Sequence, residues 1–229
     1  MAKKSRKIPR GKSSRALRRL PETLNMNDRI LIVCEGEKTE PSYFKKLVNA
    51  YRVPSAKIVI LGDGGSAPIS VVEYVESTRE EDPEFEKIFV VFDRDTHESY
   101  SRAIEKCRTF AEKCLASGTS IKVITSVPCF EYWLLLHVEE TNRPYGETSV
   151  SGSPADQLIR DLKKHDVFSG YSKADCSFFK QIFHKIDEAG KRAMRFLEQA
   201  HQDGSIQHHE NPSTRVHYIV EELARLSTK

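Results

Sequence analysis

Three carboxylates of this chain lie where they could bind a divalent cation. Glu35 directly follows the apolar run 30–34 (ILIVC), and Asp93 and Asp95 follow the apolar run 88–92 (IFVVF). Carboxylates that meet at one edge of a sheet repel one another, so a bound cation best explains their placement. Carboxylate oxygens are ligands that Mg²⁺ prefers, and Mg²⁺ supports phosphate chemistry. The sequence therefore predicts a site for Mg²⁺, which Mn²⁺ could replace.

The elements that must position these carboxylates alternate between strands and helices. Short β-branched runs separated by helical patterns are typical of buried parallel strands joined by right-handed crossovers. We expect strands at residues 29–34, 57–61, 87–93 and 121–125, and helices that begin at 39 and span 69–79 and 99–117. The predicted fold is α/β, a Rossmann-like parallel sheet of about four strands flanked by helices. Ligands of such sheets bind beyond the carboxyl ends of the strands, where the three acids fall.

The spacing of the aspartates supports a shared site. Side chains alternate along a strand, so Asp93 and Asp95 are expected to point the same way while Arg94 points away. Adjacent strands lie about 4.8 Å apart. If the first and third strands are neighbours, Glu35 and both aspartates can share one cation or a close pair. The alternative is an acidic surface turn without a function, because an Asp-x-Asp pair alone is common.

Two further residues are candidates for the same site. Glu131 follows the fourth strand and could be an additional metal ligand, or only an acidic residue in the first turn of the next helix. Lys173 precedes a distal helix and could stabilise charge on a phosphate, or lie solvated on the surface. His137, near the end of an apolar helix, is expected to be structural.

The segment after Glu35 leads into a helix N-terminus, where the helix dipole attracts anions such as phosphate. Thr39 is the predicted N-cap of this helix. Glu37 and Glu40 are interpreted as acids that favour the first helical turn. The loop 62–65 (GDGG) lacks the Gly-Lys-Ser/Thr ending of a P-loop, so nucleoside triphosphate binding is not supported.

Near the C-terminus, residues 211–214 (NPST) are predicted to form a turn and N-cap before the last helix. Arg215 could reach the site, although nothing in the sequence shows that it does. His208 and His209, which are near His201 in the sequence, lie in a polar stretch without an acid or cysteine at ligand spacing, so a solvated loop is expected there rather than zinc.

Three segments differ in composition. Residues 1–20 carry nine Lys or Arg and no acid, which leaves 27 of the 36 basic residues against 33 acidic ones in the remainder. We expect a flexible basic arm at 1–27 that either contacts nucleic-acid phosphates or only aids solubility. An α/β core is predicted at 28–140 and a helical C-terminal extension that packs on it at 141–229. The extension should contain helices at 154–166, 176–186, 188–202 and 214–226, after a short apolar helix at 130–137.

The bulk composition excludes several classes. No apolar run approaches the roughly 18 residues that a membrane helix needs, and the basic start has no apolar signal region. The five cysteines are scattered and form no Cys-x-x-Cys pair, so we expect free thiols, a cytoplasmic protein and no zinc site.

Four stretches resemble the RloB-like family: CEGEKTEPSYF, VFDRDTH, PCFEYWLLLH and NPSTRVHYIVEEL. Glu35-Gly36 on a first strand and Asp93-x-Asp95 on a third also resemble a Toprim domain, the fold of topoisomerases, primases and nucleases of the OLD type. The resemblance spans about residues 28–226. It implies a metal-dependent nuclease associated with prokaryotic defence against phage. In that scheme Asp93 and Asp95 are metal ligands, and Glu35 is a ligand or a general acid/base.

Our first hypothesis is therefore a Mg²⁺-dependent nuclease that hydrolyses phosphodiesters of RNA or DNA, with Glu35, Asp93, Asp95, Glu131 and Lys173 at its site. The alternative is a non-catalytic binding or regulatory subunit of a partner ATPase of the AAA or ABC type. Topoisomerase or primase chemistry does not fit, because no tyrosine-bearing cleavage domain or zinc module is recognisable.

Overall fold

The computed structural model describes residues 29–146, 149–173 and 175–227. The predicted basic arm at 1–27 lies outside this part of the chain. Among the described helices, none combines the length and the apolar character that crossing a membrane requires.

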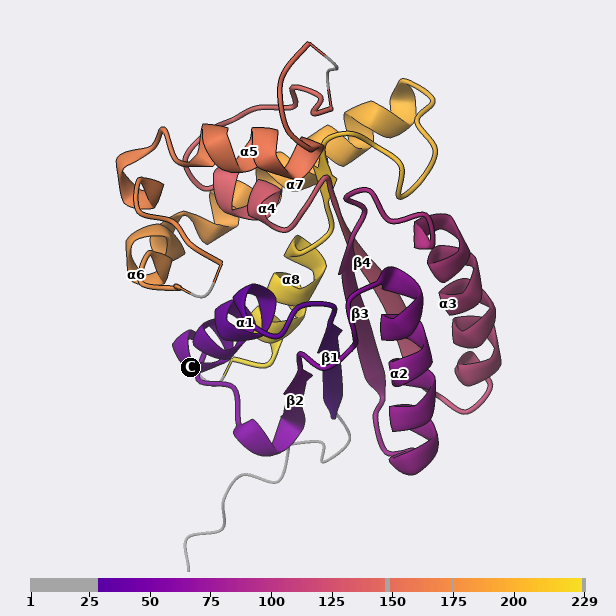
Figure 1. Ribbon diagram of the computed structural model, residues 1–229. Coiled ribbons are helices and arrows are strands. Elements are labelled where there is room, and N and C mark those ends of the chain that lie inside the picture. The colour runs from indigo at the N-terminus through magenta and orange to yellow at the C-terminus, as the bar shows by residue number, and fades with distance from the viewer. Residues whose placement is uncertain (1–28, 147–148, 174, 228–229) are drawn as a thin grey trace, which may run out of the picture.

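A five-stranded sheet forms the centre of the protein (Figure 1). Its strands are β1 (Ile30–Cys34), β2 (Ile58–Leu61), β3 (Lys87–Asp93), β4 (Ser120–Val127) and β5 (Ser213–Thr214), in the order β2-β1-β3-β4-β5. The first four are parallel and correspond to the four predicted strands. The short β5 pairs antiparallel with the end of β4 and was not predicted. The prediction of an α/β fold with a parallel sheet is confirmed.

Helices cover both faces of this sheet (Figure 1). In chain order they are α1 (Thr39–Ala50), α2 (Pro68–Glu81), α3 (Tyr100–Leu115), α4 (Glu131–Leu135), α5 (Pro154–Leu162), α6 (Phe179–Ile182), α7 (Ile186–Gln202) and α8 (His217–Arg225). Helices α2 and α3 pack on one face, through a cluster that includes Leu31, Val33, Val71 and Ala103. Helices α1, α4, α7 and α8 share the cluster on the other face.

Two predicted helices differ from the structure. The segment predicted as one helix at 176–186 contains α6 and a separate 3₁₀ turn, Phe183–Lys185. The last helix begins at His217 rather than at Thr214, because Ser213 and Thr214 pair with β4. The prediction of a turn and N-cap at 211–214 was therefore wrong for residues 213 and 214, which form β5. A two-residue strand carries no alternating pattern that a sequence could reveal.

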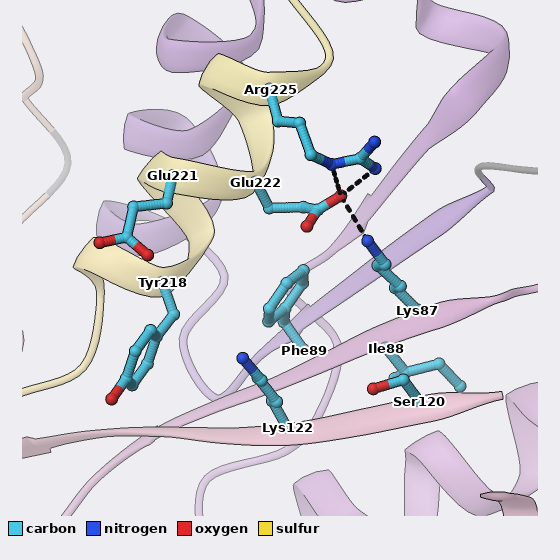
Figure 2. A pocket seen from close by; sticks show the side chains of 9 residues that line it. All are labelled: Lys87, Ile88, Phe89, Ser120, Lys122, Tyr218, Glu221, Glu222 and Arg225. Carbon is cyan, nitrogen blue, oxygen red and sulfur yellow. Dashed lines mark hydrogen bonds and ion pairs between the residues drawn. The ribbon is translucent and has the colours of Figure 1, made fainter.

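Helix α8 is tied to the sheet by charged side chains (Figure 2). Lys87 of β3 donates to Glu222 at 2.8 Å, and Arg225 of the same helix contacts this carboxylate at 2.6 Å. The ammonium group of Lys122 on β4 lies 4.8 Å from the ring centre of Tyr218. These contacts join α8 to two neighbouring strands of the sheet, β3 and β4.

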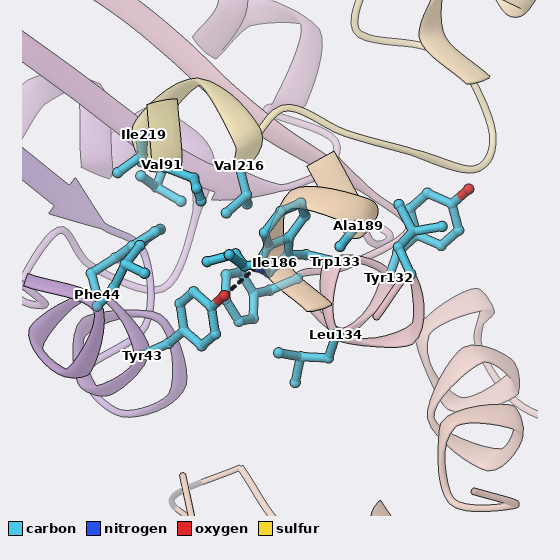
Figure 3. Close-up of a cluster of buried hydrophobic side chains, with 14 of the residues drawn as sticks. Tyr43, Phe44, Val91, Tyr132, Trp133, Leu134, Ile186, Ala189, Val216 and Ile219 are labelled. Atoms are coloured by element: carbon cyan, nitrogen blue, oxygen red, sulfur yellow. Dashed lines mark hydrogen bonds between the residues drawn. The ribbon is translucent and has the colours of Figure 1, made fainter. Parts of the chain in front are cut away.

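The larger core cluster is centred on aromatic side chains from both halves of the chain (Figure 3). Trp133 is fully buried, and its indole N–H donates to the hydroxyl of Tyr43 at 2.8 Å. Phe130 meets Tyr43 edge-to-face at 5.5 Å. Val216 and Ile219 complete the same cluster from the C-terminal segment. Because α1, α4 and the α8 segment meet here, this cluster sets the position of the residues next to the strand ends.

We predict that Trp133→Phe lowers the free energy of unfolding by roughly 1–3 kcal/mol. The change leaves a cavity and removes the donor to the Tyr43 hydroxyl. Urea unfolding measures the effect. The matched control is Leu115→Ala, because Leu115 is 69% exposed and its loss should change stability by less than about 0.5 kcal/mol. Equal effects of the two substitutions would contradict this account of the core.

Candidate functional site

A pocket of about 570 Å³ opens beyond the carboxyl ends of β1 and β3. Strands β1 and β3 are neighbours, with Cys34 opposite Val91, so the acids that follow them meet at one edge. The pocket is lined by all five residues predicted from the sequence: Glu35, Asp93, Asp95, Glu131 and Lys173. The structure thus brings the predicted residues together, while their chemical roles stay predictions.

Glu35 is held against the end of β3. Its Oε2 accepts the backbone N–H of Asp93 at 3.1 Å, and its Oε1 lies 3.3 Å from Nε2 of His97. Burial raises the pKa of Glu35, although the Asp93 N–H and His97 oppose the rise. One carboxylate oxygen is therefore committed to the backbone, and the other faces His97.

Asp93 is held in the same way from the other side. Its Oδ2 accepts the N–H of Phe130 at 3.0 Å. Burial raises the pKa of Asp93 well above its ordinary value, and the charges of Glu40 and Glu131 raise it further. Asp93, Glu40 and Glu131 therefore repel one another when they are ionised.

Asp95 lines the pocket, but the backbone conformation that places it there is not the extended strand that the sequence predicted. Strand β3 ends at Asp93, so alternation along a strand does not set the direction of Asp95. Asp95 instead has φ +31°, an uncommon value for a residue with a Cβ, and its N–H donates to the carbonyl of Pro128 at 2.9 Å. Its Oδ1 is buried and has no hydrogen-bond partner among the described residues. An orphaned carboxylate oxygen of this kind is suited to a cation.

Glu131 is the first residue of α4 and is 2% exposed. Its Oε1 accepts the hydroxyl of Tyr171 at 2.7 Å. The sequence allowed two interpretations of Glu131, a metal ligand or an acid in the first turn of a helix. Glu131 is in the first turn of α4 and also lines the pocket, so the two interpretations do not exclude each other.

Lys173 brings a positive charge to this acidic pocket. Burial acts to lower its pKa, but the charges of nearby acids, chiefly Glu131 and Asp93, outweigh that effect and raise it. The carbonyl of Lys173 accepts the hydroxyl of Thr39 at 2.7 Å. The prediction that Thr39 is an N-cap was wrong, since Thr39 lies inside α1 and its hydroxyl binds a segment 134 residues away.

Sequence reasoning missed two residues of the pocket, Glu40 and His97. Glu40 lies in the first turn of α1, as predicted, but it is 8% exposed, and burial raises its pKa to about 7 together with the charges of Glu131 and Glu35. The available signal was its position, because the first turn of a helix that follows β1 opens onto the strand ends. The signal for His97 was its place two residues after Asp95.

Backbone groups form the remaining wall. The loop 62–66 lines the pocket and leads into α2, so the N-termini of α1 and α2 both lie beside the acids. A Cβ on Gly64 would lie 2.7 Å from the carbonyl oxygen of Cys34, so this loop approaches β1 only with glycine there. Helix N-termini favour anions, so the wall complements a phosphate group.

The described residues contain no group of three or more His, Cys, Asp or Glu side chains placed to hold a metal ion. Mg²⁺ does not require such a cage, because it keeps several waters and binds through one or two carboxylates plus substrate phosphates. The orphaned Oδ1 of Asp95 and the mutual repulsion of Glu40, Asp93 and Glu131 fit that mode of binding. The donor set therefore fits Mg²⁺ or Mn²⁺ held by few protein ligands.

The other singled-out residues lie elsewhere. Arg215 lines a different cavity, which contains none of the acids above. His208 is partly buried, with Nδ1 3.0 Å from the hydroxyl of Thr125, so the expectation of a fully solvated loop was wrong for this residue. His137 is buried against Trp133, and burial lowers its pKa to about 4.

The fold and pocket define an α/β protein with an acidic site at the carboxyl ends of its parallel strands. A family model described as RloB-like protein matches residues 30–223, which is most of the chain. The protein therefore belongs to the RloB-like family. No curated protein and no solved structure matches it.

We predict that Glu40→Gln stabilises the protein at about pH 8 and has little effect at about pH 4 in the presence of a chelator. The pKa of Glu40 is about 7 in the folded protein and 4.5 ordinarily, so the folded state holds the proton more tightly. Wild type should therefore lose stability as pH rises from about 4.5 to 7, by on the order of 1–3 kcal/mol.

Urea unfolding at both pH values measures the difference. The control is Glu37→Gln, because Glu37 is an exposed acid three residues earlier in the same segment. If Glu40→Gln destabilised the protein at about pH 8, Glu40 would be a structural partner rather than a strained acid.

Proposed function

We propose that this protein is a Mg²⁺-dependent, Toprim-type nuclease that hydrolyses phosphodiester bonds of RNA or DNA in defence against phage. One observation carries the proposal: carboxylates from β3, α1 and α4 and from the turns after β1 and β3 line one pocket beside two helix N-termini. Acids that repel one another when ionised favour a divalent cation, and the helix N-termini favour a phosphate. Together these preferences fit a phosphate ester bound next to a metal.

Each side chain has a role that follows from its contacts. Asp93 and Asp95 would be the main ligands, because Asp93 keeps Oδ1 free of the Phe130 contact and Asp95 has a buried oxygen without a partner. Glu131, one of whose oxygens accepts the Tyr171 hydroxyl, would add negative charge that attracts the cation. The chemistry supplied by Mg²⁺ in such a site is polarisation of the scissile phosphate and a lower pKa of an attacking water.

Glu35 would bind metal or transfer a proton, and Lys173 would stabilise negative charge. Glu35 has a raised pKa and an oxygen next to His97, so it can bind metal or exchange a proton with a group in the pocket. Lys173 lines the pocket with its ammonium charged, and it would stabilise negative charge on the phosphate. The N-termini of α1 and α2 would orient the same phosphate.

We predict that wild type binds Mg²⁺ or Mn²⁺ and that Asp93→Asn/Asp95→Asn weakens binding by at least about tenfold. Two neutral amides remove the charge that attracts the cation while keeping the shape of the side chains. Calorimetric titration measures the affinity. Glu98→Gln/Glu112→Gln is the control, because both acids are exposed and lie outside the pocket. Equal affinity of the two double variants would exclude the aspartates as ligands.

We also predict that Mg²⁺-dependent cleavage falls roughly 100-fold or more in Glu35→Gln and in Asp93→Asn. Single- and double-stranded RNA and DNA are incubated with each protein in Mg²⁺ or in chelator, and the products are resolved on gels. Glu98→Gln should cleave like wild type. Cleavage by the two pocket variants at the wild-type rate would refute the nuclease proposal.

A second candidate is a non-catalytic subunit that binds a partner ATPase of the AAA or ABC type. The observation that favours it is the lack of three converging metal ligands among the residues that the structure describes. The same variants separate the two functions. A binding subunit would retain its partner in a pull-down, and its phenotype in phage-challenged cells, when Asp93 is replaced by Asn; a nuclease would lose the phenotype.

A further inference from the structure

One edge of strand β4 is paired over only part of its length. On this side of β4, strand β5 pairs only with Ser126 and Val127. Residues 124–127 are buried, whereas residues 120–123 alternate between exposed and partly buried. The interior strand β1, by contrast, is buried over its whole length. Within the described residues, the first half of β4 is therefore an open edge of the sheet.

The backbone groups along this open edge have a defined direction. Ser120 donates its N–H to the segment that leads into β3, whereas the carbonyl of Thr125 accepts the N–H of Arg215 from the opposite side. Even-numbered residues of β4 thus bond toward β3, and the backbone groups of Ile121 and Val123 point outward. Outward N–H and C=O groups at a sheet edge are a template for one more strand.

Two cavities flank the open edge, one on each face of the sheet. On one face, a cavity of about 600 Å³ lies between α3, α7 and the side chains of Ile121 and Val123. On the other face, a cavity of about 320 Å³ lies between α8 and residues Ser120 and Lys122 (Figure 2). Lys122 and Tyr218 line both cavities, which therefore adjoin at the edge. Because side chains alternate along a strand, those of an added strand would enter the two cavities in turn.

The two cavities favour different side chains. The walls that α3 and α7 contribute to the larger cavity include four apolar side chains, Ile104, Ala111, Met194 and Leu197. In the smaller cavity, Lys87 and Arg225 both contact Glu222. The exposed Lys122 lies instead over the ring of Tyr218, and Figure 2 draws no ion pair to it from the residues that line this cavity. An acidic residue on an added strand would complement Lys122.

This lysine distinguishes among the strands that could occupy the edge. A second copy of β4 would bring another lysine to the edge, and like charges on adjacent strands disfavour pairing. Residues 1–20 carry nine Lys or Arg and no acid, so they are disfavoured for the same reason. A segment of another protein that has an acid between two apolar residues matches both cavities.

We propose that the open edge of β4 binds an extended segment of a partner protein, which adds to the sheet as one more strand. The outward backbone groups of Ile121 and Val123 bond to this segment. Two of its apolar side chains enter the cavity between α3 and α7, and the acid between them meets Lys122. This surface is separate from the acidic pocket, and the inference does not depend on the proposed nuclease.

The test uses the full chain and fluorescent peptides of the form Thr-X-Glu-X-Thr, in which X is Val, Leu, Ile or Phe. Wild type should bind at least one peptide saturably in fluorescence anisotropy, and the same peptide with Lys in place of Glu at least about threefold more weakly. Lys122→Glu should reverse this preference. Lys180→Glu, which changes an exposed lysine of α6, should bind like wild type. Val123→Pro removes an outward N–H but no bond to β3, and it should weaken binding at least about tenfold.

Amide hydrogen exchange, followed by NMR, locates the bound peptide. The amides of Ile121 and Val123 should exchange rapidly in the free protein and at least about tenfold more slowly with peptide. The amide of Lys122, which faces β3, should change little. Slow exchange of Ile121 and Val123 without peptide would show that the chain itself or a second copy already covers the edge, and it would overturn the proposal.

The proposal is also overturned if wild type binds none of the peptides or if Lys122→Glu leaves the preference for Glu unchanged. Lys122→Glu keeps the test decisive if Val123→Pro does not fold, because Lys122 is exposed. Asp93→Asn should bind the peptides like wild type, since it changes only the acidic pocket.

Discussion

The main physical constraint on this structure is the repulsion among carboxylates that the fold gathers at one edge of its sheet. Parallel strands place their carboxyl ends together, and α1 and α4 then bring Glu40 and Glu131 to the acids that follow β1 and β3. Burial of these groups makes their ionised forms costly, and each raises the pKa of others. The aromatic cluster around Trp133 holds α1 and α4 in place against this repulsion. The pocket is thus a high-energy arrangement that hydrophobic packing maintains.

The sequence predicted the parts of this arrangement that follow from local pattern. Apolar β-branched runs identified four strands, and the carboxyl ends of parallel strands lie at one edge, so the acids at 35, 93 and 95 were expected there. The structure supplied the condition that the sequence left open, namely that β1 and β3 are neighbours. Glu131 and Lys173 were found from their positions after a strand and before a distal helix. The RloB-like resemblance rested on four separated stretches, and the family match over 30–223 confirms it.

The features that were missed depend on contacts between distant residues. The hydroxyl of Thr39 is satisfied by a carbonyl 134 positions away, and β5 exists only because β4 offers it an edge. The burial of Glu40 results from the elements that close around the first turn of α1, whereas local preference explains only its place in that turn. Asp95 points into the pocket because of a positive φ after the strand, which no alternation rule describes. In each case, contacts with residues distant in the sequence determine the hydrogen-bond partner, the burial or the backbone conformation, and local sequence does not specify these contacts.

The hydrogen bond between Thr39 and the Lys173 carbonyl has a consequence for the order in which the protein is made. Chains emerge from the ribosome N-terminus first, and their early segments begin to fold during synthesis. The acids at 35, 40, 93, 95 and 131 are therefore translated well before the lysine that offsets their charge and the segment that closes over α1. A nascent chain that stops before residue 173 carries the carboxylates without their cationic partner. The protein consequently cannot assemble its full pocket until the segment that contains Lys173 has been translated.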